Sequence, residues 1–187
     1  MAKLYVVRHA QVHVDFGVPS SEWVISEDGI RATRDLVLAE PWSEVRHIYH
    51  SPEPKAVATA RIIGDLTGIQ TTVVDALHEL RIPTINPHDE FVRRVGIYLA
   101  GFPDPEFEDW DMATNRIVDA VQTIIRLANG SSVAMVSHGR ILTVLFSCWL
   151  KRRMTVDEWR SIRLPDLSVI DMDTWQVERG FFSNLAV

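Results

Sequence analysis

The sequence predicts an α/β fold, a three-layer sandwich with a mainly parallel central sheet and helices on both of its faces. Two short segments, 4–7 and 133–136, are apolar throughout, which is typical of strands buried on both faces of a parallel sheet. Segments with the 3.6-residue period of helices alternate with such strands along the chain. Because no linker, repeat or low-complexity tract interrupts this pattern, we expect one domain over residues 1–187.

The first part of the chain is expected to contain two helices among its strands. Ser26 precedes acidic residues and should cap a helix that continues to about Leu38. Ser51 is expected to cap a second helix, which ends at Gly64 or Gly68. Short segments rich in β-formers predict the strands of this part, at 4–7, 46–50 and 71–74.

The second part begins with a region rich in proline, residues 79–111, which we expect to form a lid or insertion with a short helix at about 90–99. Two clear helical periods follow, over 112–127 and 141–150. The strands expected in this part lie at 133–136, 168–172 and 175–178.

Composition and charge exclude several classes of partner. The 187 residues carry 19 lysines and arginines against 25 acids, and a net charge of −6 argues against binding to nucleic acid or to anionic membranes. No apolar stretch approaches the roughly 20 residues of a membrane span, and no secretory signal is recognised. The one cysteine, Cys148, permits no intrachain disulfide and is expected to be a small buried hydrophobic residue. We therefore expect a cytoplasmic protein, with its oligomeric state open and a homodimer among the options.

Basic and imidazole side chains follow the two apolar strands where each strand ends. Arg8 and His9 follow the first strand, and His138 follows the second. Lys55 lies near the start of a helix that follows a third strand. Because the carboxyl ends of parallel strands meet at one edge of a sheet, these groups should line one crevice. A guanidinium, an ammonium and two imidazoles form a site for an anion, and a phosphate ester is the obvious ligand.

Neither a metal nor another cofactor is expected. His47 and His50 have the spacing of metal ligands, but on a strand they would point to opposite faces. No cysteine or His-Glu-x-x-His motif supports a zinc site. Ser137 lies outside any Gly-x-Ser-x-Gly motif, so a serine hydrolase is not indicated.

Several motifs, in this order and on these elements, resemble those of the histidine phosphatase superfamily, the phosphoglycerate mutase-like proteins of branch 1. The resemblance covers nearly the whole chain. It implies the family's α/β sandwich and its metal-independent phosphoryl transfer. The matching segments are VRHAQ at 7–11, SEDGIR at 26–31, SPEPKAVATA at 51–60, LHE at 77–79 and SHG at 137–139.

The resemblance also implies roles for individual residues. His9 would attack phosphorus and become phosphohistidine, and the adjacent Arg8 should help to keep it neutral. Arg8, Lys55 and His138 would bind the phosphoryl oxygens. Glu79 would protonate the leaving oxygen and then activate water, which requires a desolvated carboxyl group with a raised pKa.

Departures from the family pattern bear on these roles. Ala10 stands where the family has glycine, and it costs little only if its φ is negative. Lys55 stands for an arginine and lacks the bidentate fork that holds phosphate rigidly. After Glu79 the family's glycine- and tryptophan-containing stretch is missing, so Glu90 is the reserve candidate for the acid.

We therefore expect a metal-independent phosphatase that hydrolyses a small phosphomonoester through a phosphohistidine intermediate. A phosphoglycerate mutase would share the first step, but a sugar-acid hydroxyl would accept the phosphoryl group in place of water. A phosphatase of protein phosphohistidine and a degenerate, non-catalytic phosphate-binding or interaction protein are further alternatives. If residues 79–111 form a specificity lid, its acids should repel highly phosphorylated substrates: Asp104, Glu106, Glu108, Asp109 and Asp111.

Overall fold

One sheet of six strands forms the centre of the computed structural model, which describes residues 1–15 and 17–182. The strands are β1 (Lys3–Arg8), β2 (Val45–His50), β3 (Thr71–Val73), β4 (Ser132–Ser137), β5 (Asp166–Asp171) and β6 (Val177–Gly180). They lie in the order β3-β2-β4-β1-β5-β6. The first four are parallel, whereas β5 pairs antiparallel with β1 and β6 pairs antiparallel with β5. The predicted α/β fold with a mainly parallel sheet is therefore confirmed.

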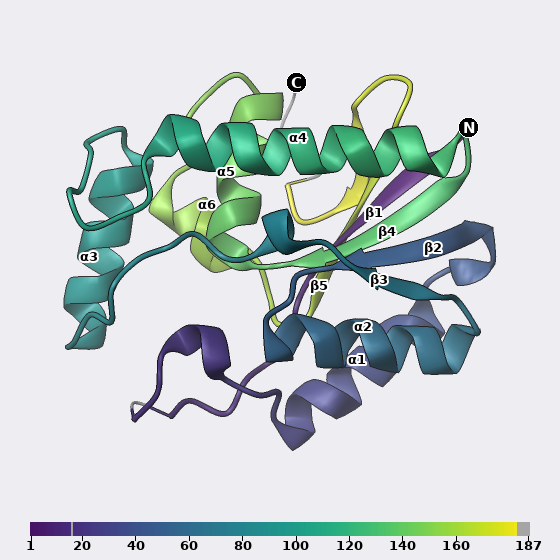
Figure 1. Cartoon of the computed structure of the whole chain (residues 1–187), viewed down its shortest axis with the longest axis horizontal. Helices are drawn as coiled ribbons and strands as arrows, with labels where there is room; N and C mark the ends of the chain where they lie inside the picture. The colour runs from purple at the N-terminus through teal and green to yellow at the C-terminus, as the bar shows by residue number, and fades with distance from the viewer. Residues whose placement is uncertain (16, 183–187) are drawn as a thin grey trace.

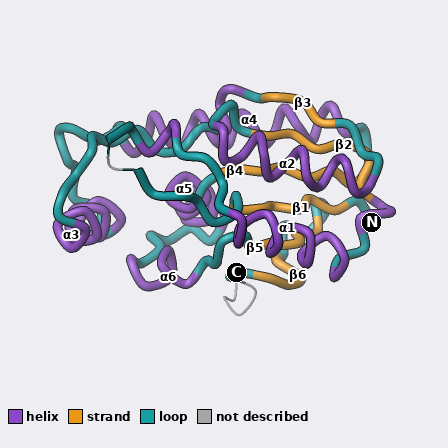
Figure 2. The backbone as a smooth tube through the Cα atoms, turned by 90° about the horizontal axis from the view of Figure 1, so that it is seen from below, coloured by secondary structure: helices purple, strands orange, loops and turns teal. Residues whose placement is uncertain are grey.

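Helices cover both faces of this sheet (Figure 1). They are α1 (Glu27–Ala39), α2 (Pro54–Thr67), α3 (His88–Leu99), α4 (Trp110–Ala128), α5 (Gly139–Trp149) and α6 (Val156–Ser161). Helices α1 and α2 pack on one face, and α4 and α5 pack on the other. Figure 2 shows that α3 and α6 lie beyond one end of the strands, where the carboxyl ends of β1 and β4 point.

The central strands are apolar throughout because each contributes to two cores. Alternate residues of a strand point to opposite faces. In β1, Leu4 and Val6 belong to the core beneath α4 and α5, while Tyr5 and Val7 belong to the core beneath α1 and α2. The residues of β4 alternate in the same way. The four core residues of β1 are at most 1% exposed, so their pattern gives a reliable strand prediction.

Several helix ends differ from expectation. Helix α2 begins at Pro54 and not after Ser51, because Ser51 accepts a hydrogen bond from the Glu53 N–H inside the loop (3.2 Å). Gly68 ends α2 with a φ of 74°, a conformation that favours glycine. Helix α6 was not expected, although its start carries a capping box between Thr155 and Glu158.

The structure bears on the expected burial of Cys148 and on the absence of an apolar stretch long enough for a membrane span. Cys148 is exposed on α5, so its expected burial is wrong. The apolar run 141–150 that contains it is buried only up to Ser147, where the helix face turns outward. Within residues 1–15 and 17–182, no helix has the length and hydropathy needed to cross a membrane.

Candidate active site

The two predicted histidines lie side by side at the carboxyl ends of β1 and β4. These strands are parallel neighbours, with Arg8 in register with Ser137. The His9 N–H continues the ladder and donates to the Ser137 carbonyl oxygen (3.0 Å). The centroids of the His9 and His138 rings are 5.1 Å apart. The sheet therefore brings together residues that are far apart in the sequence.

His9 is held with one ring nitrogen available for attack. Its Nδ1 lies 2.8 Å from the Ala10 carbonyl oxygen, which can only accept a hydrogen bond, so Nδ1 carries the proton. The other nitrogen, Nε2, then keeps its lone pair. Burial lowers the pKa of His9 well below its ordinary value, and repulsion from His138, Lys55 and Arg8 lowers it further. Arg8 does help to keep His9 neutral, as expected, but burial is the larger cause.

The turn after His9 accommodates alanine without strain. Ala10 is buried and is not among the described non-glycine residues with positive φ. Its N–H donates to Thr59 Oγ1 of α2 (3.0 Å). Beside it, a Cβ atom on Gly29 of α1 would lie 2.3 Å from the Gln11 carbonyl oxygen. Close packing of α1 and α2 thus fixes the backbone that carries His9.

His138 is fully buried and precedes α5 directly. Its Nε2 lies 2.7 Å from Ser51 Oγ. Burial lowers the pKa of His138 well below its ordinary value, and the positive charges of Lys55 and Arg140 add to this effect. Both histidines of the site are therefore neutral at physiological pH.

Arg8 supplies a buried guanidinium beside the two imidazoles. It donates through Nη1 to the Ile162 carbonyl oxygen. Burial lowers the pKa of Arg8 to about 10, which leaves it charged at neutral pH. A Cβ atom on Gly139 would lie 2.9 Å from Arg8 Cζ, so the glycine after His138 makes room for the guanidinium.

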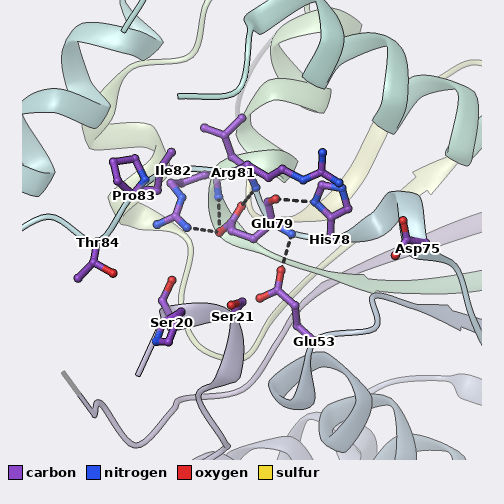
Figure 3. Close-up of a pocket in the computed structure, with 13 residues that line it drawn as sticks. Ser20, Ser21, Glu53, Asp75, His78, Glu79, Arg81, Ile82, Pro83 and Thr84 are labelled. Atoms are coloured by element: carbon purple, nitrogen blue, oxygen red, sulfur yellow. Dashed lines mark hydrogen bonds and ion pairs between the residues drawn. The ribbon is translucent and has the colours of Figure 1, made fainter. Parts of the chain in front are cut away.

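Lys55 lies in the same cavity, but a carboxylate already neutralises it. Its Nζ is 2.5 Å from Glu53 Oε2 and 2.6 Å from the Ser20 carbonyl oxygen. The Lys55 and Glu53 side chains are only 6% and 10% exposed. Glu53 Oε1 also accepts the Glu79 N–H (2.7 Å), an approach visible in Figure 3. Lys55 was predicted from the sequence motif, whereas its partner Glu53 was not predicted.

Glu79 is held by the start of α5. Its carboxylate accepts the N–H groups of Leu80 and Ile141, each at 2.9 Å, and of Arg140 at 3.3 Å. Burial raises the pKa of Glu79, but Arg140 and these N–H donors outweigh burial and leave the pKa below its ordinary value. The expected raised pKa is therefore wrong, and Glu79 is ionised at neutral pH.

The reserve candidate, Glu90, lies elsewhere. It forms an ion pair with Arg93 along the same face of α3, with oxygen and nitrogen 2.7 Å apart. It does not line the cavities that contain Glu79. Glu79, and not Glu90, thus lines the same cavity as His9.

The cavity above His9 has a volume of about 420 Å³, and both charged and apolar side chains line it. The charged and imidazole groups of its lining are Arg8, His9, Lys55, Glu79, His88, Arg140, Arg160 and Arg163. An adjoining pocket of about 360 Å³ is shown in Figure 3. Ser20, Glu79 and Arg140 line both spaces. The apolar lining of the cavity includes Val12, Val14, Phe91, Val92 and Trp159.

Arg140 is a cationic lining residue that the sequence analysis missed. It occupies the first turn of α5, immediately after the His138-Gly139 motif, and is 9% exposed. That position was a usable signal, because the first turn of a helix that follows a strand-end histidine must lie at the same edge of the sheet. The described residues contain no cluster of three or more side chains arranged to hold a metal ion.

The acids expected to repel highly phosphorylated substrates are largely neutralised. Asp104 and Glu106 both pair with Arg94, at 2.6 and 2.9 Å. Glu108 pairs with Arg116 at 2.7 Å. The Asp109 side chain caps α4. These contacts hold the segment between α3 and α4 together. They therefore do not support the expected repulsion of highly phosphorylated substrates.

Comparisons with known proteins agree with this geometry. The family model described as "Histidine phosphatase superfamily (branch 1)" matches residues 4–180. A curated relative, the probable phosphoglycerate mutase GpmB of Yersinia pestis (strain Pestoides F), is 26% identical over 185 residues. That match covers 92% of this chain and 85% of the relative.

Solved structures share the fold at low sequence identity. Bacillus stearothermophilus YhfR superposes with a TM-score of 0.78 at 19% identity, and the match covers 100% of this chain and 98% of the other. A phosphoserine phosphatase from Entamoeba histolytica, solved as a mutant with phosphoserine, gives 0.77 at 12% identity over 100% of both chains. The mycobacterial glucosyl-3-phosphoglycerate phosphatase gives 0.67 at 19% identity over 90% and 89%.

Proposed function

The chain belongs to the histidine phosphatase superfamily (branch 1), and from that premise we propose that it hydrolyses small phosphomonoesters through a phosphohistidine on His9. The observation that carries the proposal is the state of His9. Its ring is neutral, its Nδ1 proton is engaged by the Ala10 carbonyl oxygen, and its Nε2 lone pair is available next to a buried guanidinium.

In the first step, His9 Nε2 attacks phosphorus and the bond from phosphorus to the ester oxygen breaks. Arg8 and His138 stabilise the charge on the phosphoryl oxygens. The leaving oxygen takes a proton from Glu79. The pKa of Glu79 is lowered by its own surroundings, but the negative charge of a bound phosphoryl group raises the pKa of a neighbouring carboxyl group. Substrate binding therefore favours uptake of that proton by Glu79 from solvent.

In the second step, the Glu79 carboxylate accepts a proton from water as the water oxygen attacks the phosphorus of phosphohistidine. The phosphorus–nitrogen bond breaks, inorganic phosphate leaves, and His9 regains its lone pair. Because side chains supply the positive charge at each step, we propose that neither a metal nor another cofactor takes part.

We prefer hydrolysis to mutase activity because part of the cavity lining suits an organic leaving group. Val12, Val14 and Phe91 supply apolar surface for the organic part of an ester that leaves after transfer. The same lining also carries polar and basic side chains: Ser20, His88, Arg160 and Arg163. Phosphatases among the proteins of similar fold are consistent with this choice.

The test is phosphate release from an aryl phosphate in the presence of a chelator. We expect turnover in the wild type and a loss of about 10³-fold or more in His9→Ala. His13→Ala is the matched control, because His13 is exposed and lies outside the cavity. Protonation of His9 should lower kcat/KM in acid. Since the pKa of His9 is lowered, this fall in kcat/KM should occur below pH 6.5.

Three outcomes would contradict the proposal. Equal activity of the wild type and His9→Ala would exclude the phosphohistidine route. Conversion of one phosphoglycerate isomer into another without net phosphate release would favour the mutase. Binding of phosphate with no turnover of any ester would favour a non-catalytic protein.

A further inference from the structure

Arg140 is built into the site in a way that the proposed mechanism does not yet use. Its side chain is 11% exposed and lines both the cavity above His9 and the adjoining pocket. Its Cζ lies 5.4 Å from the centroid of the Phe91 ring, and its Nη2 lies 3.6 Å from Glu79 Oε2. Its Nε is buried and has no hydrogen-bond partner among the described residues. The guanidinium is thus held in place, but its hydrogen-bonding capacity is not filled.

Lys55, another cation of this cavity, differs from Arg140 because its charged group already has close partners. Lys55 Nζ, the cation that the sequence motif predicts for phosphate binding, already contacts Glu53 Oε2 and the Ser20 carbonyl oxygen. A phosphoryl group that reached Lys55 would have to compete with a buried carboxylate at 2.5 Å. Two negative groups sharing one ammonium in a desolvated site repel each other strongly.

The positive charges of Arg8 and Arg140 also act on each other. Arg140 is close enough to Arg8 and His138 that its charge lowers the pKa of both groups. An anion placed between the two guanidiniums would relieve this repulsion. Planar guanidiniums also offer the paired N–H donors that match phosphoryl oxygens, which an ammonium does not.

We propose that Arg140 is the second phosphoryl-binding cation of this site, and that Glu53 has removed Lys55 from that role. The inference deepens the proposed function, because it names a binding residue for the same phosphoryl group. It concerns binding alone, so it does not require that the protein turn over any substrate.

The experiment measures binding of inorganic phosphate by calorimetry to the wild type, Arg140→Gln and the double variant Glu53→Gln/Lys55→Gln. We expect Arg140→Gln to raise Kd by about 10- to 50-fold, because a charge-assisted bond to phosphate is lost. The double variant removes both members of the buried ion pair without leaving an unpaired carboxylate, and should change Kd by less than about threefold. A larger loss in Glu53→Gln/Lys55→Gln than in Arg140→Gln would overturn the proposal, and so would a wild type that does not bind phosphate.

Two further variants separate binding from a merely structural role. Arg140→Lys keeps the charge but not the fork, and should bind phosphate between the wild type and Arg140→Gln. Glu53→Gln releases Lys55, so the double variant Glu53→Gln/Arg140→Gln should regain at least part of the lost affinity. Failure of this rescue, with both proteins folded by circular dichroism, would contradict the claim about Glu53. If His9→Ala keeps full activity while Arg140→Gln loses phosphate affinity, the proposed function fails and this inference stands.

Discussion

The floor and the wall of the cavity are held in different ways. We define the floor as Arg8, His9 and His138, at the ends of β1 and β4, and the wall as the facing side chains of α3 and α6, Phe91 and Trp159. Strand β1 is paired along its whole length with β4 on one side and β5 on the other, so backbone hydrogen bonds fix the floor. The wall depends on side-chain contacts, such as the edge-to-face packing of Phe91 on Trp159 with centroids 5.8 Å apart.

This difference suggests that the floor and the wall have separate functions. Groups that take part in phosphoryl transfer need positions fixed to within a fraction of an ångström, and paired central strands provide such positions. Groups that contact the organic part of a substrate need only offer an apolar surface of suitable shape. Substitutions in the floor should therefore affect kcat and the fold, whereas substitutions in the wall should mainly affect KM.

The largest effect is expected where the floor meets the start of α5. Glu79→Gln removes the group proposed to donate and accept protons, and kcat should fall by about 10³-fold, within the range of general acid–base catalysis. Steady-state kinetics with an aryl phosphate would measure this. Glu90→Gln is the matched control and should leave kcat unchanged, because Glu90 pairs with Arg93 away from the cavity. A large loss in Glu90→Gln instead would reverse the assignment.

The next largest effect concerns the close packing of Gly29 against the turn that follows His9. In Gly29→Ala the new Cβ would lie 2.3 Å from the Gln11 carbonyl oxygen, and neither backbone can move without shifting the turn after His9. We expect a loss of about 3 kcal/mol in the free energy of unfolding, measured with urea.

Gly96→Ala on α3 is the comparison for the wall. There the nearest atom to a new Cβ is Val156 Cβ at 3.4 Å, and alanine favours helix more than glycine does. The free energy of unfolding should be unchanged or rise by up to about 1 kcal/mol. Equal losses in Gly29→Ala and Gly96→Ala would remove the contrast between the two regions.

The floor could be predicted from sequence because its signals are local. The alternation of Leu4, Tyr5, Val6 and Val7 between two cores makes an uninterrupted apolar strand, and such strands place their following residues at one edge of the sheet. The neutral state of His9 also follows from a burial that this pattern implies. The fold, the strands and the proximity of His9 to His138 could therefore be predicted from the sequence.

The parts that escaped prediction depend on contacts between distant segments. The lowered pKa of Glu79 comes first from the charge of Arg140 and then from the N–H groups of Leu80 and Ile141. No local pattern gives the position of Arg140 and Ile141 relative to Glu79. Glu53 neutralises Lys55 because Glu53 is the N-cap residue of α2 and Lys55 lies in its first turn, where their side chains come within 2.5 Å of each other. Helix α6 is short and its periodicity is weak, so only its capping box could have revealed it.

A smaller effect is expected when the wall itself is changed. Phe91→Ala removes an apolar contact surface and the ring beneath Arg140. We expect KM for an aryl phosphate to rise by about tenfold, equivalent to about 1.4 kcal/mol, while kcat changes by less than about threefold. Phe102→Ala is the control, because Phe102 is 66% exposed and lies outside the cavity. A fall in kcat with unchanged KM would show that Phe91 acts through the floor.

The smallest effect concerns the support behind the wall and depends on pH. Glu158 closes the capping box of α6, and its hydrogen bonds with Arg152 and Thr155 lower its pKa from 4.5 to about 2. A carboxyl group with a lowered folded-state pKa stabilises the fold above its unfolded pKa and loses that contribution as the pH falls toward the folded pKa. Glu158→Gln should therefore cost about 1 kcal/mol at pH 7, and the gap to the wild type should narrow between pH 4.5 and pH 2. Urea unfolding at pH 7, 5, 4 and 3 measures this gap, with the exposed Glu22→Gln as control. If the difference in unfolding free energy between the two proteins grows as the pH falls, Glu158 does not stabilise α6 through its charge. The wall would then be held by aromatic packing alone.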